Sequence, residues 1–162
     1  MGYFFSFQKM NYVKGKKPEG CILCLVRDKS PDVENLVVYQ NNFVGITLNL
    51  FPYNPGHLMI FPLRHETEIR NLSKEERHAF DDALDLSLTV LDKVYHPYAY
   101  NIGYNMGKVA GASIDHLHQH VIPRYPNEVG ITELIVGNRV LVEDIRESYR
   151  RIQEAFNSLL QE

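Results

Sequence analysis

The sequence predicts a single α+β domain, with an antiparallel sheet, a central helix and a C-terminal helix. Three observations support this fold class. Short apolar segments bounded by turn residues occur in runs, which favours antiparallel strands over alternating βαβ units. One long segment carries apolar residues at helical spacing, and a second such segment closes the chain. The length of 162 residues suits one domain, 1–162, with a sizeable core.

The first 20 residues are expected to form an N-terminal arm that ends in a turn, because Gly15, Pro18 and Gly20 interrupt any regular element. Five strands are expected after this arm. The pair Asn41–Asn42 is a plausible hairpin turn between the first two of them. The strands are predicted over residues 36–40, 43–50, 57–62, 99–104 and 117–122, the last being ended by a proline.

Ser73 is expected to begin the central helix, since Glu76 three residues later completes a capping box and Pro97 ends the segment. The apolar stripe of this helix consists of Phe80, Leu84, Leu88, Leu91 and Val94. A C-terminal extension, 126–162, contains the second amphipathic helix. Its stripe consists of Ile145, Tyr149, Ile152, Phe156 and Leu159.

The bulk composition excludes several classes of partner. The formal net charge is -3, so there is no global positive field for nucleic acid or an anionic membrane. No apolar run approaches the roughly 20 residues of a membrane span, and the N-terminus does not resemble a signal peptide. We therefore expect a cytoplasmic protein that binds neither nucleic acid nor membrane.

The segment HLHQH carries a histidine at every second position. On a strand such positions share one face, so His116, His118 and His120 are expected to point the same way. Burial of three imidazoles costs several kcal/mol unless each nitrogen is bonded or binds a metal, which disfavours a purely structural role. Zinc binding and nucleophilic catalysis both use imidazoles, and the spacing alone does not decide between them.

The residues around these histidines resemble the signature of the histidine triad (HIT) family. HLHQHVIPR resembles its His-x-His-x-His motif followed by two apolar residues, and NPGHLMIFPLRH resembles its Pro-Gly-His strand. The resemblance covers residues 20–125 and implies a HIT-like fold. The start of the chain and its tail, including residues 130–137, are similar to a bacterial branch resembling diadenosine tetraphosphate phosphorylases and fragile-histidine-triad-like hydrolases.

This resemblance implies a phosphorylase or hydrolase that cleaves dinucleoside polyphosphates such as diadenosine tetraphosphate. His118 is the implied nucleophile: its neutral imidazole attacks the α-phosphorus, and water or inorganic phosphate then releases the nucleotide from a nucleotidyl-histidine. The other ring nitrogen must hold its proton, and the family pattern matches a backbone carbonyl to that task. His120 and His57 are the implied donors that stabilise the phosphoryl oxygens.

Four further residues are implied in substrate binding. Asn49 matches a polar residue that contacts the ribose. Asn105 and Ser113 match donors to the phosphates, and Gly111 lets the loop backbone approach an anion closely. The chain reads Gly-Ala-Ser where related phosphorylase-like chains often read Gly-Gly-Ser, so Ala112 departs from the pattern in the acceptor-phosphate pocket.

The two cysteines of the chain, Cys21 and Cys24, form a CxxC pair that supplies half of a tetrahedral zinc site. Reduced free cysteines are the alternative. The resemblance implies that His65 and His116 complete a Cys2His2 site. Such a zinc ion is structural, because four protein ligands leave no open position for a catalytic water.

Two other functions stay open from the sequence. A nucleoside phosphoramidase, the activity of another HIT branch, would use the same His118. A sensor that binds nucleotide and turns it over slowly belongs to a different class, and steady-state turnover would discriminate it. The family also implies a homodimer, formed through the central helix and an edge strand.

Overall fold

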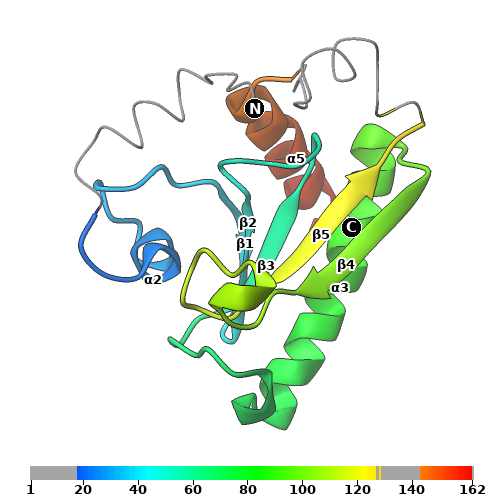
Figure 1. Ribbon diagram of the computed structural model, residues 1–162. Coiled ribbons are helices and arrows are strands. Elements are labelled where there is room, and N and C mark those ends of the chain that lie inside the picture. The colour runs from blue at the N-terminus through cyan, green and yellow to red at the C-terminus, as the bar shows by residue number, and fades with distance from the viewer. Residues whose placement is uncertain (1–17, 127, 129–142, 162) are drawn as a thin grey trace.

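Five antiparallel strands form the central sheet of the computed structural model, in the order β1-β2-β3-β5-β4 (Figure 1). The structure describes residues 18–126, 128 and 143–161. The predicted α+β class with an antiparallel sheet is confirmed. The strands are β1 (Val37–Gln40), β2 (Val44–Leu48), β3 (Leu58–Pro62), β4 (Ala99–Tyr104) and β5 (Gln119–Arg124).

The predicted hairpin turn between β1 and β2 is confirmed, and its geometry depends on one side chain. Asn41 Oδ1 accepts hydrogen bonds from the backbone N–H groups of Phe43 and Val44, both at 2.8 Å. An asparagine that bonds to its own backbone two residues on is a common turn former. The predicted strands 36–40, 43–50 and 57–62 are shortened by one to three residues at their ends.

The central helix α3 (Lys74–Tyr95) begins as the sequence predicts. Ser73 Oγ accepts from the backbone N–H of Glu76 at 3.1 Å, and the Glu76 carboxylate accepts from the backbone N–H of Ser73 at 2.8 Å. Two orphan N–H groups are thereby satisfied. The helix ends at His96, which adopts a left-handed conformation directly before Pro97.

The helices α3 and α5 (Ile145–Leu159) cover one face of the sheet, and the short helix α2 (Ile22–Arg27) covers the other (Figure 1). The main core lies between the sheet and the two long helices. On the opposite face, Leu23 and Val26 of α2 pack with Met59 and Phe61 of β3. Helix α2, which contains Cys24 and has Cys21 as its N-cap residue, is not predicted from the sequence. The described residues also contain two 3-10 turns, η1 (Ile69–Asn71) and η2 (Lys108–Ala110).

The predicted strand 117–122 is wrong at both ends, because β5 runs from Gln119 to Arg124. Its start is delayed because the Leu117 N–H donates to the Glu66 carbonyl, at 2.6 Å, outside the sheet. Its end extends through Pro123, which pairs only with β4 because the pairing with β3 stops at Val121. Proline has no N–H to donate, so it is tolerated in a strand at a position that pairs with a neighbouring strand on one side only.

Among the described residues, no helix has the length and apolar character required to cross a lipid bilayer. Most of the predicted N-terminal arm, residues 1–17, lies outside the described residues. The tail motif at 130–137 lies outside them as well.

Candidate active site and metal site

Three of the predicted catalytic histidines gather on the α2 face of the sheet. His57 directly precedes β3, His118 directly precedes β5, and His120 lies on β5. The ring centroids of His57 and His120 are 5.1 Å apart, and those of His118 and His120 are 4.8 Å apart. His120 pairs across the sheet with Met59, which packs against α2, and cross-strand partners share a face. The fold therefore brings these side chains together on two neighbouring strands. His57 and His120, which are in contact, are 63 residues apart in the sequence.

The hydrogen bonds of His57 determine which of its nitrogens carries the proton. The backbone N–H of Tyr53 points at its Nδ1 from 3.2 Å, and the Asn49 amide Nδ2 lies 3.4 Å from the same atom. A backbone N–H can only donate, so Nδ1 is an acceptor and the neutral ring carries its proton on Nε2. Nε2 then donates to Nδ1 of His120, at 2.9 Å, which leaves the His120 proton on Nε2.

This chain of hydrogen bonds changes the role expected for His57. Both of its ring nitrogens are engaged, and only 1% of the residue is exposed. In this structure the Nε2–H of His57 is directed at His120, whereas the expected role of His57 is donation to a phosphate. The hydrogen bond from His57 leaves the proton of His120 on Nε2. Gly56 permits the turn before His57 with a φ of +81°, where a Cβ atom would lie 3.0 Å from Leu91 and Tyr95 side-chain atoms.

The ring of His118 is oriented by its own backbone neighbour. Nδ1 of His118 lies 2.7 Å from the carbonyl oxygen of His116, so it carries the proton and donates. The lone pair of the neutral ring is then on Nε2. This is the orientation that the family pattern requires of a nucleophile whose other nitrogen is held by a carbonyl.

Burial keeps these imidazoles neutral. Desolvation, with smaller contributions from the neighbouring rings, lowers the pKa of His57 to about 3. Desolvation and the nearby His118 lower the pKa of His120 to about 4. The pKa of His118 is also lowered by burial, against the opposing effect of its bond to the His116 carbonyl. Near neutral pH a neutral His118 retains the lone pair that nucleophilic attack requires.

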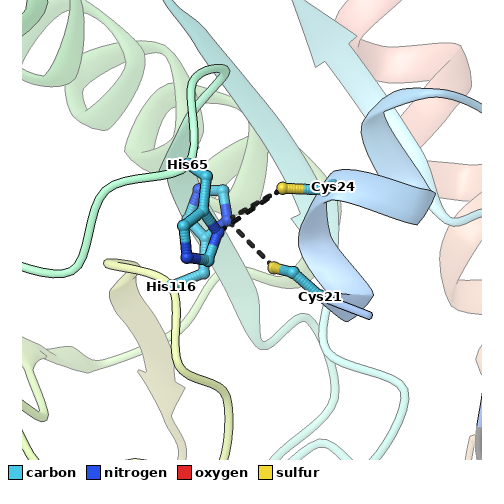
Figure 2. A group of neighbouring side chains, drawn as sticks. All are labelled: Cys21, Cys24, His65 and His116. Atoms are coloured by element: carbon cyan, nitrogen blue, oxygen red, sulfur yellow. Dashed lines mark hydrogen bonds between the residues drawn. The ribbon is translucent and has the colours of Figure 1, made fainter. Parts of the chain in front are cut away.

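His116 belongs to a second cluster, with Cys21, Cys24 and His65 (Figure 2). Its ring is directed at the cysteines, with Nδ1 3.2 Å from the Cys21 sulfur and 3.6 Å from the Cys24 sulfur. The His116 ring also lies 5.9 Å from the ring of Phe61, which packs against α2, so all three triad rings lie on the α2 face of the sheet. His116 and His118 precede the regular strand, which begins at Gln119.

The second cluster has the composition and spacing of a metal site. Its four ligand atoms all lie within 4.8 Å of one another, and Nδ1 of His65 is 3.6 Å from the Cys24 sulfur. Adjacent ligand atoms of a tetrahedral Cys2His2 zinc site are separated by about 3.3–3.8 Å. Nε2 of His116 donates to the Pro62 carbonyl at 2.9 Å, which leaves Nδ1 as the lone-pair nitrogen on the cysteine side.

The electrostatics of the cysteines also fit a cation. Burial and the adjacent Cys21 raise the pKa of Cys24 to about 11, so without a nearby positive ion this thiol stays protonated. A bound divalent cation reverses this preference and deprotonates a coordinating thiol. The residues present therefore fit a zinc ion, with α2 supplying the thiols and the loops before α3 and β5 supplying the imidazoles.

Two of the four residues expected to bind substrate lie at these clusters, Asn49 beside His57 and Ser113 at a cavity that His65 also lines. Asn49 contacts His57 through Nδ2 and accepts from the Phe51 N–H through Oδ1, at 3.0 Å. Asn105 and Gly111 flank η2, and Gly111 adopts a φ of +90°. Ser113 lines a cavity of about 310 Å³ next to the metal cluster, together with Gly20, Cys21, Ile22, His65, Ile114 and Asp115. None of the three predicted catalytic histidines lines this cavity, whereas Cys21 and His65 of the second cluster do.

Sequence reasoning missed Tyr53 and Asn54, which precede the Pro-Gly-His segment. The Tyr53 ring stacks on His57 with a centroid distance of 5.1 Å and an interplanar angle of 25°. Asn54 is a buried polar residue with 5% exposure. The proline-punctuated loop in which they lie was recognised, but only the fold shows that its backbone bends around His57.

The depressed histidine pKa values predict acid sensitivity. The unfolded chain gains protons as the pH falls below the ordinary histidine pKa of about 6.5, whereas His57 and His120 stay neutral to about pH 3 and pH 4. The contribution of these two neutral histidines to the free energy of unfolding is therefore complete above about pH 6.5 and is lost as the pH falls. The free energy of unfolding should decrease by up to about 1.4 kcal/mol per pH unit for each such histidine.

Urea unfolding between about pH 7 and pH 5 measures this slope, above the range of most carboxylates. His57→Gln should flatten it relative to the wild-type protein. His78→Gln, at an exposed position on α3, is the control and should leave it unchanged. Equal slopes for the wild type and His57→Gln would contradict the prediction.

The comparisons with known proteins agree with this geometry. The family model described as "HIT domain" matches residues 30–127. The AP-4-A phosphorylase of Mycobacterium tuberculosis is 37% identical over 120 residues, which cover 74% of this chain and 62% of the relative. The asymmetrical bis(5'-nucleosyl)-tetraphosphatase of Schizosaccharomyces pombe is 29% identical over 103 residues, which cover 64% of this chain and 57% of the relative. The chain thus spans about three fifths of the length of these curated relatives.

A solved structure with the same fold is a zinc-bound histidine triad family protein from Mycobacterium smegmatis. It has a TM-score of 0.71 at 22% sequence identity, and the alignment covers 88% of this chain and 96% of that one. The HIT-domain match over 30–127 includes more than half of the chain and contains His57, His116, His118 and His120. The chain therefore belongs to the histidine triad (HIT) family.

Proposed function

We propose that this protein is an enzyme that cleaves dinucleoside polyphosphates by transferring a nucleotidyl group to His118. The observation that carries the proposal is the hydrogen bond from His118 Nδ1 to the His116 carbonyl, at 2.7 Å, beside a second neutral imidazole. It leaves the lone pair of a neutral ring on Nε2. The named activities of the phosphorylase and tetraphosphatase relatives support the substrate class.

In the proposed reaction, His118 Nε2 attacks the α-phosphorus in line with the bond to the leaving polyphosphate. The new N–P bond forms as the P–O bond to the leaving group breaks, which gives a nucleotidyl-His118. His120 donates its Nε2–H to the developing charge on the phosphoryl or leaving oxygen. His57 holds the His120 proton on Nε2 through the 2.9 Å hydrogen bond between the rings.

The second half of the reaction releases the nucleotide from His118. Attack by inorganic phosphate gives a nucleoside diphosphate, and attack by water gives a nucleoside monophosphate. The match to the phosphorylase covers 74% of this chain at 37% identity, whereas the match to the bis(5'-adenosyl)-triphosphatase of Saccharomyces cerevisiae covers 60% at 36% identity, and on this longer match we propose inorganic phosphate as the acceptor.

Substrate contacts are proposed for four residues. The loop between β4 and β5 presents Asn105 and Gly111 as phosphate contacts, and Gly111 has the positive φ that lets backbone N–H groups face an anion. Ser113 adds a hydroxyl donor at the end of the same loop. Asn49 is adjacent to His57, where its amide would contact a ribose hydroxyl as well as the imidazole.

We further propose a structural zinc ion bound by Cys21, Cys24, His65 and His116. The zinc-bound relative from M. smegmatis supports this assignment. The ion, when bound, supplies only a structural crosslink. The ligands themselves join α2 to the loops before α3 and β5, and the His116 carbonyl holds the proton of His118.

A homodimer is also proposed. Within the described sheet β4 pairs only with β5, so one edge of β4 is open. Ile102 on this strand is 43% exposed, and Tyr98, directly before it, is 82% exposed. A second copy that pairs along β4 would cover both the strand edge and these apolar side chains.

Product analysis with diadenosine tetraphosphate tests the proposed function. ATP plus ADP, formed only when inorganic phosphate is present, is the expected result. ATP plus AMP without phosphate would identify water as the acceptor. Turnover of adenosine 5'-phosphoramidate in the absence of any polyphosphate cleavage would overturn the proposed substrate class, and a tight nucleotide complex without turnover would overturn the enzymatic function.

Replacement of His120 by asparagine should reduce kcat by about 10²–10³-fold while changing KM much less, since its N–H acts on charge that develops in the transition state. His96→Asn, at the exposed end of α3, provides a control with the same chemical change. Steady-state kinetics with diadenosine tetraphosphate measure both parameters. An unchanged kcat for His120→Asn would assign His120 to packing or ground-state binding instead.

A further inference from the structure

The loop that delivers His57 is attached to the far end of the triad strand by one buried side chain. Asn54 Nδ2 donates to the carbonyl oxygen of Pro123 at 2.7 Å, three residues beyond His120 on β5. The backbone carbonyl of Asn54 accepts from the N–H of His57 at 3.2 Å. Asn54 therefore connects the backbone of one catalytic histidine to the strand that carries the other.

The position of this contact explains why an amide is suited to it. The pairing of β3 with β5 ends at Leu58 and Val121, and beyond it the chain before β3 turns away into the Pro-Gly loop. The Pro123 carbonyl lies past that end, and a buried carbonyl requires a donor. At this position β3 no longer pairs with β5 and supplies no N–H for the Pro123 carbonyl. The Asn54 amide supplies this N–H instead, so its side chain extends the contact between the loop before β3 and β5.

A second partner holds the same amide. Asn54 Nδ2 lies 3.1 Å from Oε1 of Glu128, whose side chain is only 10% exposed. Glu128 also accepts from the Tyr125 backbone N–H at 2.6 Å and pairs with Arg124. The Tyr125 hydroxyl in turn donates to the Pro55 carbonyl at 2.9 Å. The residues after β5 thus hold the loop before His57 at two consecutive positions, Asn54 and Pro55.

We propose that Asn54 is a positioning residue that maintains the hydrogen bond between His57 and His120. Its amide, held between Pro123 and Glu128, fixes the loop relative to β5 so that His57 Nε2 stays 2.9 Å from His120 Nδ1. A hydrogen bond weakens steeply when its partners separate or tilt, so a loop displacement of about 1 Å would release the His120 proton from its fixed position. The kinetic consequence rests on the proposed function, whereas the geometric one does not.

The closing experiment compares Asn54→Asp and Asn54→Ala with the wild-type protein by NMR, using metal-loaded, substrate-free protein with isotope-labelled histidine. Asn54→Asp keeps the shape of the side chain but removes both N–H donors and places a carboxylate against the Pro123 carbonyl and Glu128. Asn42→Asp makes the same chemical change at an exposed position of the β1–β2 turn and is the matched control.

In the wild type, His57 should show an unprotonated Nδ1 and a slowly exchanging Nε2 proton. Both Asn54 variants should exchange this proton at least tenfold faster, and the control should not. Asn54→Ser provides a milder variant if the others fail to fold. Retention of the protected Nε2 proton in every folded Asn54 variant would overturn the proposal and leave Asn54 with a role in stability alone.

Kinetics give a second readout. With diadenosine tetraphosphate, kcat of the folded Asn54 variants should fall by about tenfold or more while KM stays within about threefold, because the loss is in the orientation of His120. A rise in KM at constant kcat would contradict this. If the wild type has no turnover, the proposed function fails, yet the exchange of the His57 proton still decides the positioning role.

Discussion

Replacement of His118 by alanine should reduce the turnover of diadenosine tetraphosphate by at least about 10⁴-fold, the largest kinetic effect expected of any single substitution here. Of the three histidines in the cluster, only His118 donates from Nδ1 to the His116 carbonyl, at 2.7 Å, and so has its lone pair on Nε2. The substitution removes this imidazole. Without it the displacement has no nucleophile and cannot be divided into two easier steps. Nucleotide binding should remain measurable, because the neighbouring contacts persist.

Rapid quenching of the wild-type reaction, followed by peptide mass analysis, measures the intermediate directly. A nucleotide on His118 is the expected adduct. An adduct on His116 or His120 in the intact protein, and never on His118, would refute the assignment. His78→Ala, at an exposed site on α3, controls for the loss of an imidazole elsewhere and should retain wild-type turnover.

Removal of the proposed zinc ion should cause the largest loss of stability. A ligand present at about a thousand times its Kd stabilises the folded state by about 4 kcal/mol, which corresponds to a fall in Tm on the order of 10 °C for a chain of this size. The ligands come from three segments around residues 21–24, 65 and 116, so the metal closes long loops. Occupancy should fall in mild acid, because the cysteines must be thiolates and the histidines neutral.

Thermal unfolding with and without a chelator measures the effect. The double variant Cys21→Ser with Cys24→Ser should unfold at the lower Tm and should no longer respond to the chelator, which serves as the internal control. Activity should fall only indirectly, through the position of the His116 carbonyl. Less than about a tenth of an equivalent of zinc in protein purified without added metal, together with freely titrating native thiols, would contradict the site.

The parts of the fold that local chemistry specifies could be predicted from the sequence. The Ser73–Glu76 capping box and the Asn41 turn each depend on neighbouring side chains, and both form as expected. Helix α2 could not be predicted in the same way. It has six residues, too few for an apolar period, and it is stabilised by packing of Leu23 against β3 rather than by its own sequence.

The candidate site likewise has features that local sequence patterns predict and features that only the fold determines. The residue types and the alternate positions predicted that the triad rings share one face, and the structure has them on the α2 face of the sheet. The proton positions of His57 and His120 could not be predicted, because they depend on groups that only the fold brings to these rings. The deciding donor for His57 is the backbone N–H of Tyr53, which has no signature in the sequence.

His116 contributes two different chemical groups to the two clusters: its imidazole faces the cysteines, and its main-chain carbonyl holds the proton of His118. Every amino acid has that carbonyl, whereas only a few side chains bind a metal. In evolutionary terms the two clusters are therefore separable at this position. A lineage that lost the cysteines would be free to replace the histidine at 116 by any residue that keeps the local backbone path, while position 118 would tolerate no such drift.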